Sequence, residues 1–70
     1  MKALTFKTTI KSEKDVLNIT NLLHNYFSLK SADFEISGRS SILHIEGKNI
    51  IPKKIEQAIQ LFGHRCRLLL

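Results

Sequence analysis

Hydrophobic and polar residues alternate along the first part of the chain. Between residues 3 and 11, the positions of one parity hold Leu4, Phe6, Thr8 and Ile10. The positions between them hold threonine and lysine, and this period of two predicts a β-strand with one buried face and one solvated face. The alternation returns over residues 33–37 and over residues 41–46. Residues 38–40, Gly-Arg-Ser, predict a turn between these two segments, so that they form a β-hairpin.

Two other segments have a helical period. Between residues 13 and 28, apolar residues recur at spacings of three and four, at Val16, Ile19, Leu23 and Phe27. This pattern is typical of an amphipathic helix. A second apolar stripe begins after Pro52, which suits the first turn of a helix, and it ends at Gly63, a common helix terminator. Its members are Ile55, Ala58, Ile59 and Phe62. The last segment, residues 64–70, is short and apolar and predicts a final strand.

The element order is therefore β-α-β-β-α-β, and the length of 70 residues predicts one domain, residues 1–70. Right-handed crossovers then favour an α+β ferredoxin-like sandwich, with both helices on one face of a four-stranded antiparallel sheet. The predicted core lies between these two layers. It consists of Phe6, Ile10, Val16, Ile19, Leu23, Phe27, Phe34, Ile36, Ile45, Ile55, Ile59 and Phe62.

Charge and cysteine content narrow the possible functions. The chain has eleven Lys and Arg against six Asp and Glu, and its net charge of +5 favours contact with anionic partners. Its one cysteine, Cys66, excludes an internal disulfide and a multi-cysteine metal cage, which fits a cytoplasmic location. The sequence shows no signal peptide and no run near the roughly 20 apolar residues of a membrane span, so no membrane partner is expected.

Several segments resemble the heavy-metal-associated domain, the module of copper chaperones and of metal-ATPase tails. Residues 4–11, Leu-Thr-Phe-Lys-Thr-Thr-Ile-Lys, are similar to the first strand of that family, and residues 42–47 to its third strand. Residues 58–64 resemble its second helix and the loop that follows. The resemblance spans nearly the whole chain and implies the same sandwich. The family carries two cysteines, separated by two residues, at the start of its first helix, whereas the corresponding residues here are Ser12 and Asp15.

The resemblance also implies that His64 lies close to this loop, which makes Ser12, Asp15 and His64 the candidate metal ligands. A hydroxyl and a carboxylate are hard donors, so we do not expect Cu(I), which prefers two thiolates. An imidazole with a carboxylate suits weak binding of Zn(II) or Ni(II) better, although a structural zinc site wants about four ligands. The alternative interpretation is structural. Ser12 and Asp15 then form a helix N-cap, and His64 is a solvent-facing histidine.

Neither Cys66 nor the histidines indicate an enzyme. Cys66 lies two residues beyond His64 and pairs with it as a soft ligand, or else is a small core residue. The sequence suggests no nucleophile with a neighbouring base, and it contains no glycine-rich phosphate loop.

The remaining classes are binding functions. Lys7, Lys11, Arg65 and Arg67 predict a basic edge of the sheet that would attract nucleic acid, but the outward positions lack the aromatic platform of RNA-recognition modules. Asp33 and Glu35 lie towards the opposite edge, and such a charge-divided face suits a protein partner or a second copy of the chain. The sequence therefore predicts a small, non-enzymatic, copper-chaperone-like binding domain. Its predicted role is protein interaction or weak, altered metal binding, and the alternative is a basic nucleic-acid-binding domain.

Overall fold

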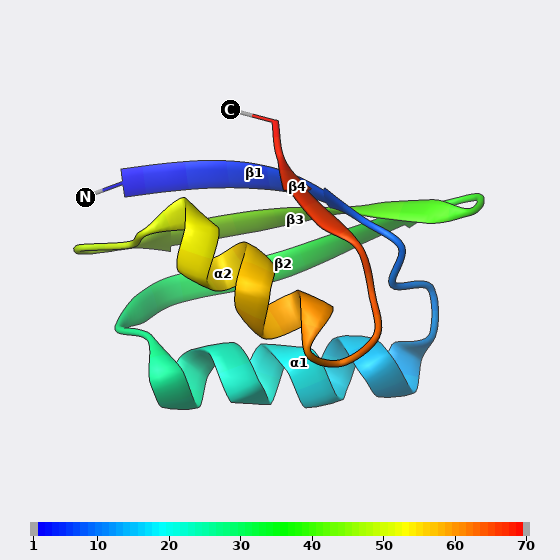
Figure 1. Cartoon of the computed structure of the whole chain (residues 1–70), viewed down its shortest axis with the longest axis horizontal. Coiled ribbons are helices and arrows are strands. Elements are labelled where there is room, and N and C mark those ends of the chain that lie inside the picture. Colours follow the sequence, from blue (N-terminus) through cyan, green and yellow to red (C-terminus); the bar gives the residue numbers. More distant parts are fainter. Residues whose placement is uncertain (1, 70) are drawn as a thin grey trace.

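The computed structural model describes residues 2–69, so Met1 and Leu70 of the predicted domain lie outside the described residues. Six elements follow one another: β1 (Lys2–Thr8), α1 (Glu13–Tyr26), β2 (Leu29–Ser37), β3 (Ser40–Gly47), α2 (Pro52–Gln60) and β4 (Cys66–Leu68). The strands form one antiparallel sheet in the order β2-β3-β1-β4 (Figure 1). This arrangement confirms the predicted α+β ferredoxin-like fold.

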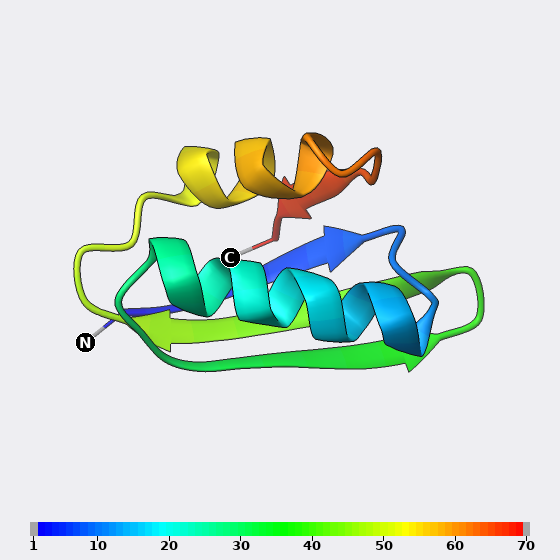
Figure 2. The same cartoon turned by 90° about the horizontal axis from the view of Figure 1, so that it is seen from below.

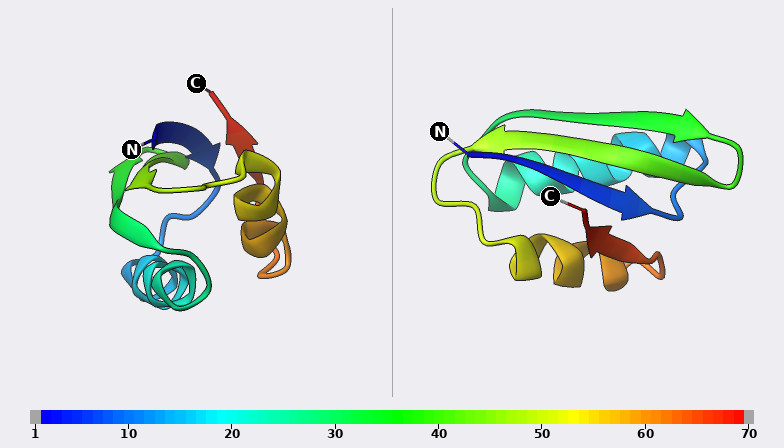
Figure 3. Two further views of the ribbon diagram at one scale, coloured as in Figure 1. Left: turned by 90° about the vertical axis from the view of Figure 1, so that its left-hand side faces the viewer. Right: turned by 90° about the horizontal axis from the view of Figure 1, so that it is seen from above.

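The two helices lie on one side of the twisted sheet. Helix α1 packs along β2 and helix α2 along β4, so each helix lies near one edge of the sheet. Figure 2 shows that the helices run in opposite directions, side by side. The right panel of Figure 3 looks onto the other face of the sheet, which no helix covers and which we call the open face.

The core lies between the sheet and the helices. Phe6 in β1 is directly opposite Leu43 in β3, and both side chains are fully buried. Opposed apolar pairs of this kind are the units that stabilise a sheet. Ten of the twelve predicted core residues are buried or packed against the buried cluster. They are Phe6, Ile10, Val16, Ile19, Leu23, Phe27, Phe34, Ile45, Ile55 and Ile59.

The core prediction is wrong for Ile36 and Phe62, whose exposed fractions are 44% and 50%. Ile36 has the expected parity, but it lies on the edge strand β2, opposite Ser41 in the last row that β1 reaches before the hairpin extends past it (Figure 3, right). Phe62 follows the end of α2 at Gln60, so the helical stripe no longer turns it towards the sheet. Both errors come from extending a correct period past the point where the opposing layer ends.

Several boundaries differ from the predicted ones. The last strand is Cys66–Leu68 rather than the predicted residues 64–70, and α2 ends at Gln60, before the predicted terminator Gly63. Strand β1 ends at Thr8 rather than at residue 11, although the Thr9 amide still donates to the Arg65 carbonyl at 3.1 Å. Helix α1 ends at Tyr26 rather than at residue 28. Strand β2 begins at Leu29, four residues earlier than predicted. The sequence pattern does not show this start, because an irregularity between Leu29 and Ser31 interrupts the alternation that marks a strand.

Two glycines permit the tight connections of β3. Gly38, with φ of +63°, is the first residue of the two-residue turn that closes the β2–β3 hairpin, a position that favours glycine. Gly47 ends β3 against the connection between α1 and β2. A Cβ atom at Gly47 would lie 2.7 Å from the Ser28 carbonyl oxygen and 3.0 Å from Cδ1 of Ile50. The chain therefore needs glycine at residue 47 to let two backbone segments approach each other.

We expect Gly47→Ala to lower the free energy of unfolding by about 1–3 kcal/mol, since the added methyl group meets backbone that cannot move aside. Chemical denaturation followed by circular dichroism measures this change. The control is Glu46→Ala at the exposed neighbouring residue, which should change the same quantity by less than about 0.5 kcal/mol. Equal stabilities of Gly47→Ala and the unchanged protein would contradict the close approach.

Candidate functional site

Asp15 and His64 meet at one end of the molecule. Asp15 lies in the first turn of α1, and His64 lies in the connection between α2 and β4. Their closest atoms, Nε2 of His64 and Oδ2 of Asp15, are 3.5 Å apart, and the side chains are 21% and 43% exposed. The structure therefore brings together two of the three residues that the sequence proposes as metal ligands.

Ser12 occupies the N-cap position of α1, but its side chain makes no capping hydrogen bond. The helix begins instead with a backbone bond, in which the Val16 amide donates to the Ser12 carbonyl at 2.9 Å. The predicted side-chain cap is therefore wrong. The carboxylate of Asp15, the other predicted capping group, lies against the imidazole of His64.

The donor set at this end of the fold is small. Among residues 2–69, no three His, Cys, Asp or Glu side chains gather closely enough to hold a metal ion. A nitrogen and a carboxylate suit a borderline metal such as Zn(II), but a structural zinc site has about four ligands. The pair fits a weak site completed by water and does not make a closed cage. The geometry also offers no thiolate pair for Cu(I), since Cys66 is the chain's one cysteine.

Cys66 is a core residue, as one of the two interpretations of the sequence holds. Its side chain faces the helices from β4 and is 6% exposed. Burial, helped by the nearby Glu56 carboxylate, raises the pKa of the thiol from its usual 9.0 to about 12. Metal ligation and nucleophilic attack both need the thiolate, and this burial disfavours the thiolate at neutral pH.

Glu56 closes the outer edge of β4. Its Oε2 atom accepts a hydrogen bond from the Leu68 amide at 2.8 Å, on the side of β4 that no strand pairs with. Unpaired amides at a sheet edge invite pairing with another chain, and a carboxylate on the amide blocks it. The contact joins a helix to a strand, so no local sequence pattern marks it.

The open face carries its charges in cross-strand rows. Lys7 in β1 is opposite Arg67 in β4 on one side and Ile42 in β3 on the other. Ile42 is in turn opposite Glu35 in β2. One row therefore reads acid, apolar, base, base from β2 to β4. The next row contains Asp33 in β2, opposite His44 in β3.

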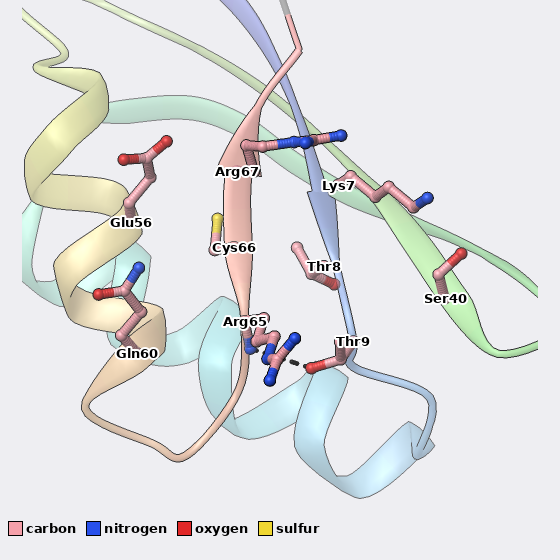
Figure 4. A pocket seen from close by; sticks show the side chains of 9 residues that line it. All are labelled: Lys7, Thr8, Thr9, Ser40, Glu56, Gln60, Arg65, Cys66 and Arg67. Atoms are coloured by element: carbon pink, nitrogen blue, oxygen red, sulfur yellow. Dashed lines mark hydrogen bonds between the residues drawn. The ribbon is translucent and has the colours of Figure 1, made fainter.

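A hollow of about 540 Å³ lies at the basic end of these rows, beside β1 and β4. Figure 4 shows Lys7 and Arg67 extending to the same side of the strands, with Arg65 next to Thr9. The Arg65 amide donates to Oγ1 of Thr9 at 3.0 Å, which holds this end of β4 against β1. Three cationic side chains therefore line the hollow, together with Glu56 and Gln60 from α2.

The open face is neutral as a whole. Its exposed acidic residues are Asp33, Glu35 and Glu46, and its exposed basic residues are Lys7, Arg65 and Arg67. The net charge of +5 therefore resides on the rest of the chain. Lys11 is not part of the face, contrary to the predicted basic edge, because β1 ends at Thr8 and Lys11 lies in the following connection.

Two observations bear on nucleic acid and membranes. Phe6 and Phe34 face the helix side, and within residues 2–69 no phenylalanine or tyrosine lies on the open face. The face therefore has no platform on which bases could stack. None of the helices that the structure describes has the length and apolar character needed to cross a membrane.

No protein-family model matches the chain, and neither the curated proteins nor the solved structures include a significant match. The resemblance to the heavy-metal-associated domain therefore stays a prediction from the sequence.

We expect Cys66 to resist alkylation in the folded protein. The rise of its pKa from 9.0 to about 12 lowers the thiolate fraction at neutral pH roughly a thousandfold relative to the unfolded chain. Mass spectrometry after iodoacetamide treatment, with and without denaturant, gives the two rates. Native and denatured alkylation rates within about tenfold of each other would contradict the assigned burial.

The same shift implies that the fold loses stability as the pH rises above 9.0, where the thiol of the unfolded chain ionises, towards 12, where the thiol of the folded chain ionises.

Proposed function

We propose that this chain is a small, non-enzymatic protein-interaction domain of the heavy-metal-associated type, and that its open face docks onto a second copy of the chain. The order of charges across the face supports this proposal, with carboxylates on β2 and cationic side chains on β1 and β4. Complementary charge across an interface steers association and selects the partner. A cytoplasmic location belongs to the same proposal, since a chain with one buried cysteine needs no oxidising compartment.

One two-fold axis satisfies the charges. An axis that lies between two facing sheets and runs parallel to their strands places β2 of each copy over β4 of the other. Glu35 of one copy then lies over Arg67 of the second copy, and the symmetry repeats the contact. An axis that runs across the strands would place the carboxylates of β2 over each other. The charge order therefore favours one of the two face-to-face arrangements.

The size of the face sets the expected strength. Four strands about 4.8 Å apart make a face roughly 19 Å wide and on the order of 500 Å² in area. A stable complex buries about 800 Å² per partner. Among the described residues, the apolar side chains on this face are Ala3, Ile42 and Leu69, and all three are at least partly exposed. We therefore expect weak association, visible at protein concentrations of about 1 mM.

Nucleic acid is the alternative on the same topology, and the geometry favours it less. A phosphate backbone laid across the open face would meet the carboxylates of β2 as well as the basic edge. Without base stacking, the three cationic side chains would give salt-sensitive contacts only. Saturable binding of a labelled single-stranded oligonucleotide at about 0.15 M salt would support this alternative and contradict the docking proposal.

A charge exchange tests the docking of two copies. Arg67→Glu should weaken self-association, because it places two carboxylates against each other, and Glu35→Arg should do the same. The double variant Glu35→Arg/Arg67→Glu should restore association, since it re-creates the pair in reverse. Sedimentation equilibrium at increasing protein concentration measures these changes.

The matched control is Lys53→Glu, which makes the same charge change as Arg67→Glu on α2, away from the open face. Its self-association should equal that of the unchanged protein or exceed it, since it lowers the net charge. A monomer at about 1 mM would contradict the proposal. Failure of the double variant to recover would contradict the proposed axis.

The Asp15–His64 contact supports weak metal binding as a second candidate function. Titration with zinc or nickel chloride, followed by amide shifts of the labelled protein, should move residues around Asp15 and His64 saturably at millimolar metal. His64→Ala should abolish these shifts, and Ser12→Ala should reduce them less, since no contact joins its hydroxyl to the pair.

His44 supplies a matched control for this experiment. Its Nε2 atom lies 3.7 Å from Oε2 of Glu35, so it forms a similar imidazole–carboxylate pair on the open face. His44→Ala should leave the shifts around His64 unchanged. An absence of saturable shifts at Asp15 and His64, or equal shifts at both histidine pairs, would contradict a selective site.

A further inference from the structure

Helices α1 and α2 leave an apolar groove between them, on the side of the molecule opposite the open face. Its volume is about 560 Å³, and the helices run antiparallel along its two sides (Figure 2). The apolar residues that line the groove are Leu22, Tyr26, Phe27, Ala58, Leu61 and Phe62.

Three of these residues are unusually exposed for their size. The exposed fractions are 75% for Tyr26, 87% for Leu61 and 50% for Phe62. Single exposed hydrophobic residues are common on protein surfaces, but a contiguous group marks an interaction site. Tyr26 is the last residue of α1, Leu61 and Phe62 directly follow α2, and all three line one groove. The failure of Phe62 to join the core therefore contributes to a surface that suits an apolar partner.

The charges beside the groove are positive. Lys54 is the one charged residue that lines it. A second hollow shares Tyr26 and Phe27 with the groove and is lined by Lys48, again without an acidic residue. The end of the groove near Tyr26 is therefore electropositive.

We propose that this groove binds an amphipathic helix of another protein, with apolar residues at helical spacing and carboxylates beside the lysines. Helices laid into apolar grooves are a recurring mode of recognition, anchored by residues about three or four apart. A second copy of this chain is the poorer occupant, because each copy carries a net charge of +5. The helices of a second copy also offer few exposed anchors outside the groove, among them Leu17 on α1.

Two synthetic peptides test this inference without knowledge of the natural partner. Both are about four helical turns long and carry leucine along one face. One has glutamate at its remaining positions, and the other has lysine. The glutamate peptide should bind saturably and shift the amide signals of Tyr26, Leu61 and Phe62. The lysine peptide should bind at least about tenfold more weakly, because its lysines would be repelled by Lys48 and Lys54.

Variants of the chain locate the contact. Leu61→Ser should weaken binding of the glutamate peptide by about tenfold or more, since central apolar anchors dominate such interfaces. The matched control is Leu17→Ser, a similar change at an exposed leucine that does not line the groove, and it should leave binding unchanged. Lys54→Glu should weaken the glutamate peptide and strengthen the lysine peptide.

Three results would overturn the proposal. One is the absence of saturable binding by the glutamate peptide. A second is equal binding by both peptides, which would indicate nonselective apolar adhesion. The third is binding to vesicles of anionic lipid, but not to the glutamate peptide, that Leu61→Ser abolishes. That result would assign the groove to a membrane surface. None of these results depends on the open face, so the proposed function and this inference can fail separately.

Discussion

The antiparallel register of β1 against β3 is the constraint on which the rest of this structure depends. It places Leu4 opposite Ile45 and Phe6 opposite Leu43, and all four side chains face the helices. Because side chains alternate along a strand, a slip of β1 by one residue would expose Leu4 and Phe6 and turn polar neighbours such as Lys7 towards the helices. The loss of so much apolar burial makes the register strongly determined.

The same register also sets the chemistry of the uncovered side. With Lys7 held opposite Ile42, pairing carries the row outwards to Glu35 on β2 and to Arg67 on β4. Residues that are distant in sequence thereby make an ordered sequence of charges across the sheet. The Asp15–His64 contact forms where the loops at one end of the layers meet. The two helices leave their groove on the side of the molecule opposite the open face. The fold thus presents two surfaces of different character, one polar and neutral overall and one apolar with positive charge beside it.

The order of elements and most of the core were predictable from the sequence, because the change between periods of two and of three or four records which face each residue buries. The prediction failed where a local pattern continues beyond its packing partner, as at Ile36 and Phe62. It also failed at Ser12, where residue type indicates a side-chain cap but the hydroxyl makes no such bond. The contact of Glu56 with the Leu68 amide depends on how a helix sits against an edge strand, and no periodicity encodes that. The meeting of Asp15 with His64 followed from a resemblance rather than from spacing.

An intermolecular spin-label experiment tests whether the charge order directs two copies to face each other with β2 over β4. A nitroxide attached through Ser37→Cys, with Cys66→Ala removing the native thiol, would sit on the open face at the end of β2. This unenriched copy is mixed with an unlabelled, ¹⁵N-enriched one. If β2 of each copy lies over β4 of the other, the nitroxide broadens amide signals of residues 65–69 in the enriched copy. Broadening centred on β2, or no broadening at millimolar concentration, would contradict this arrangement.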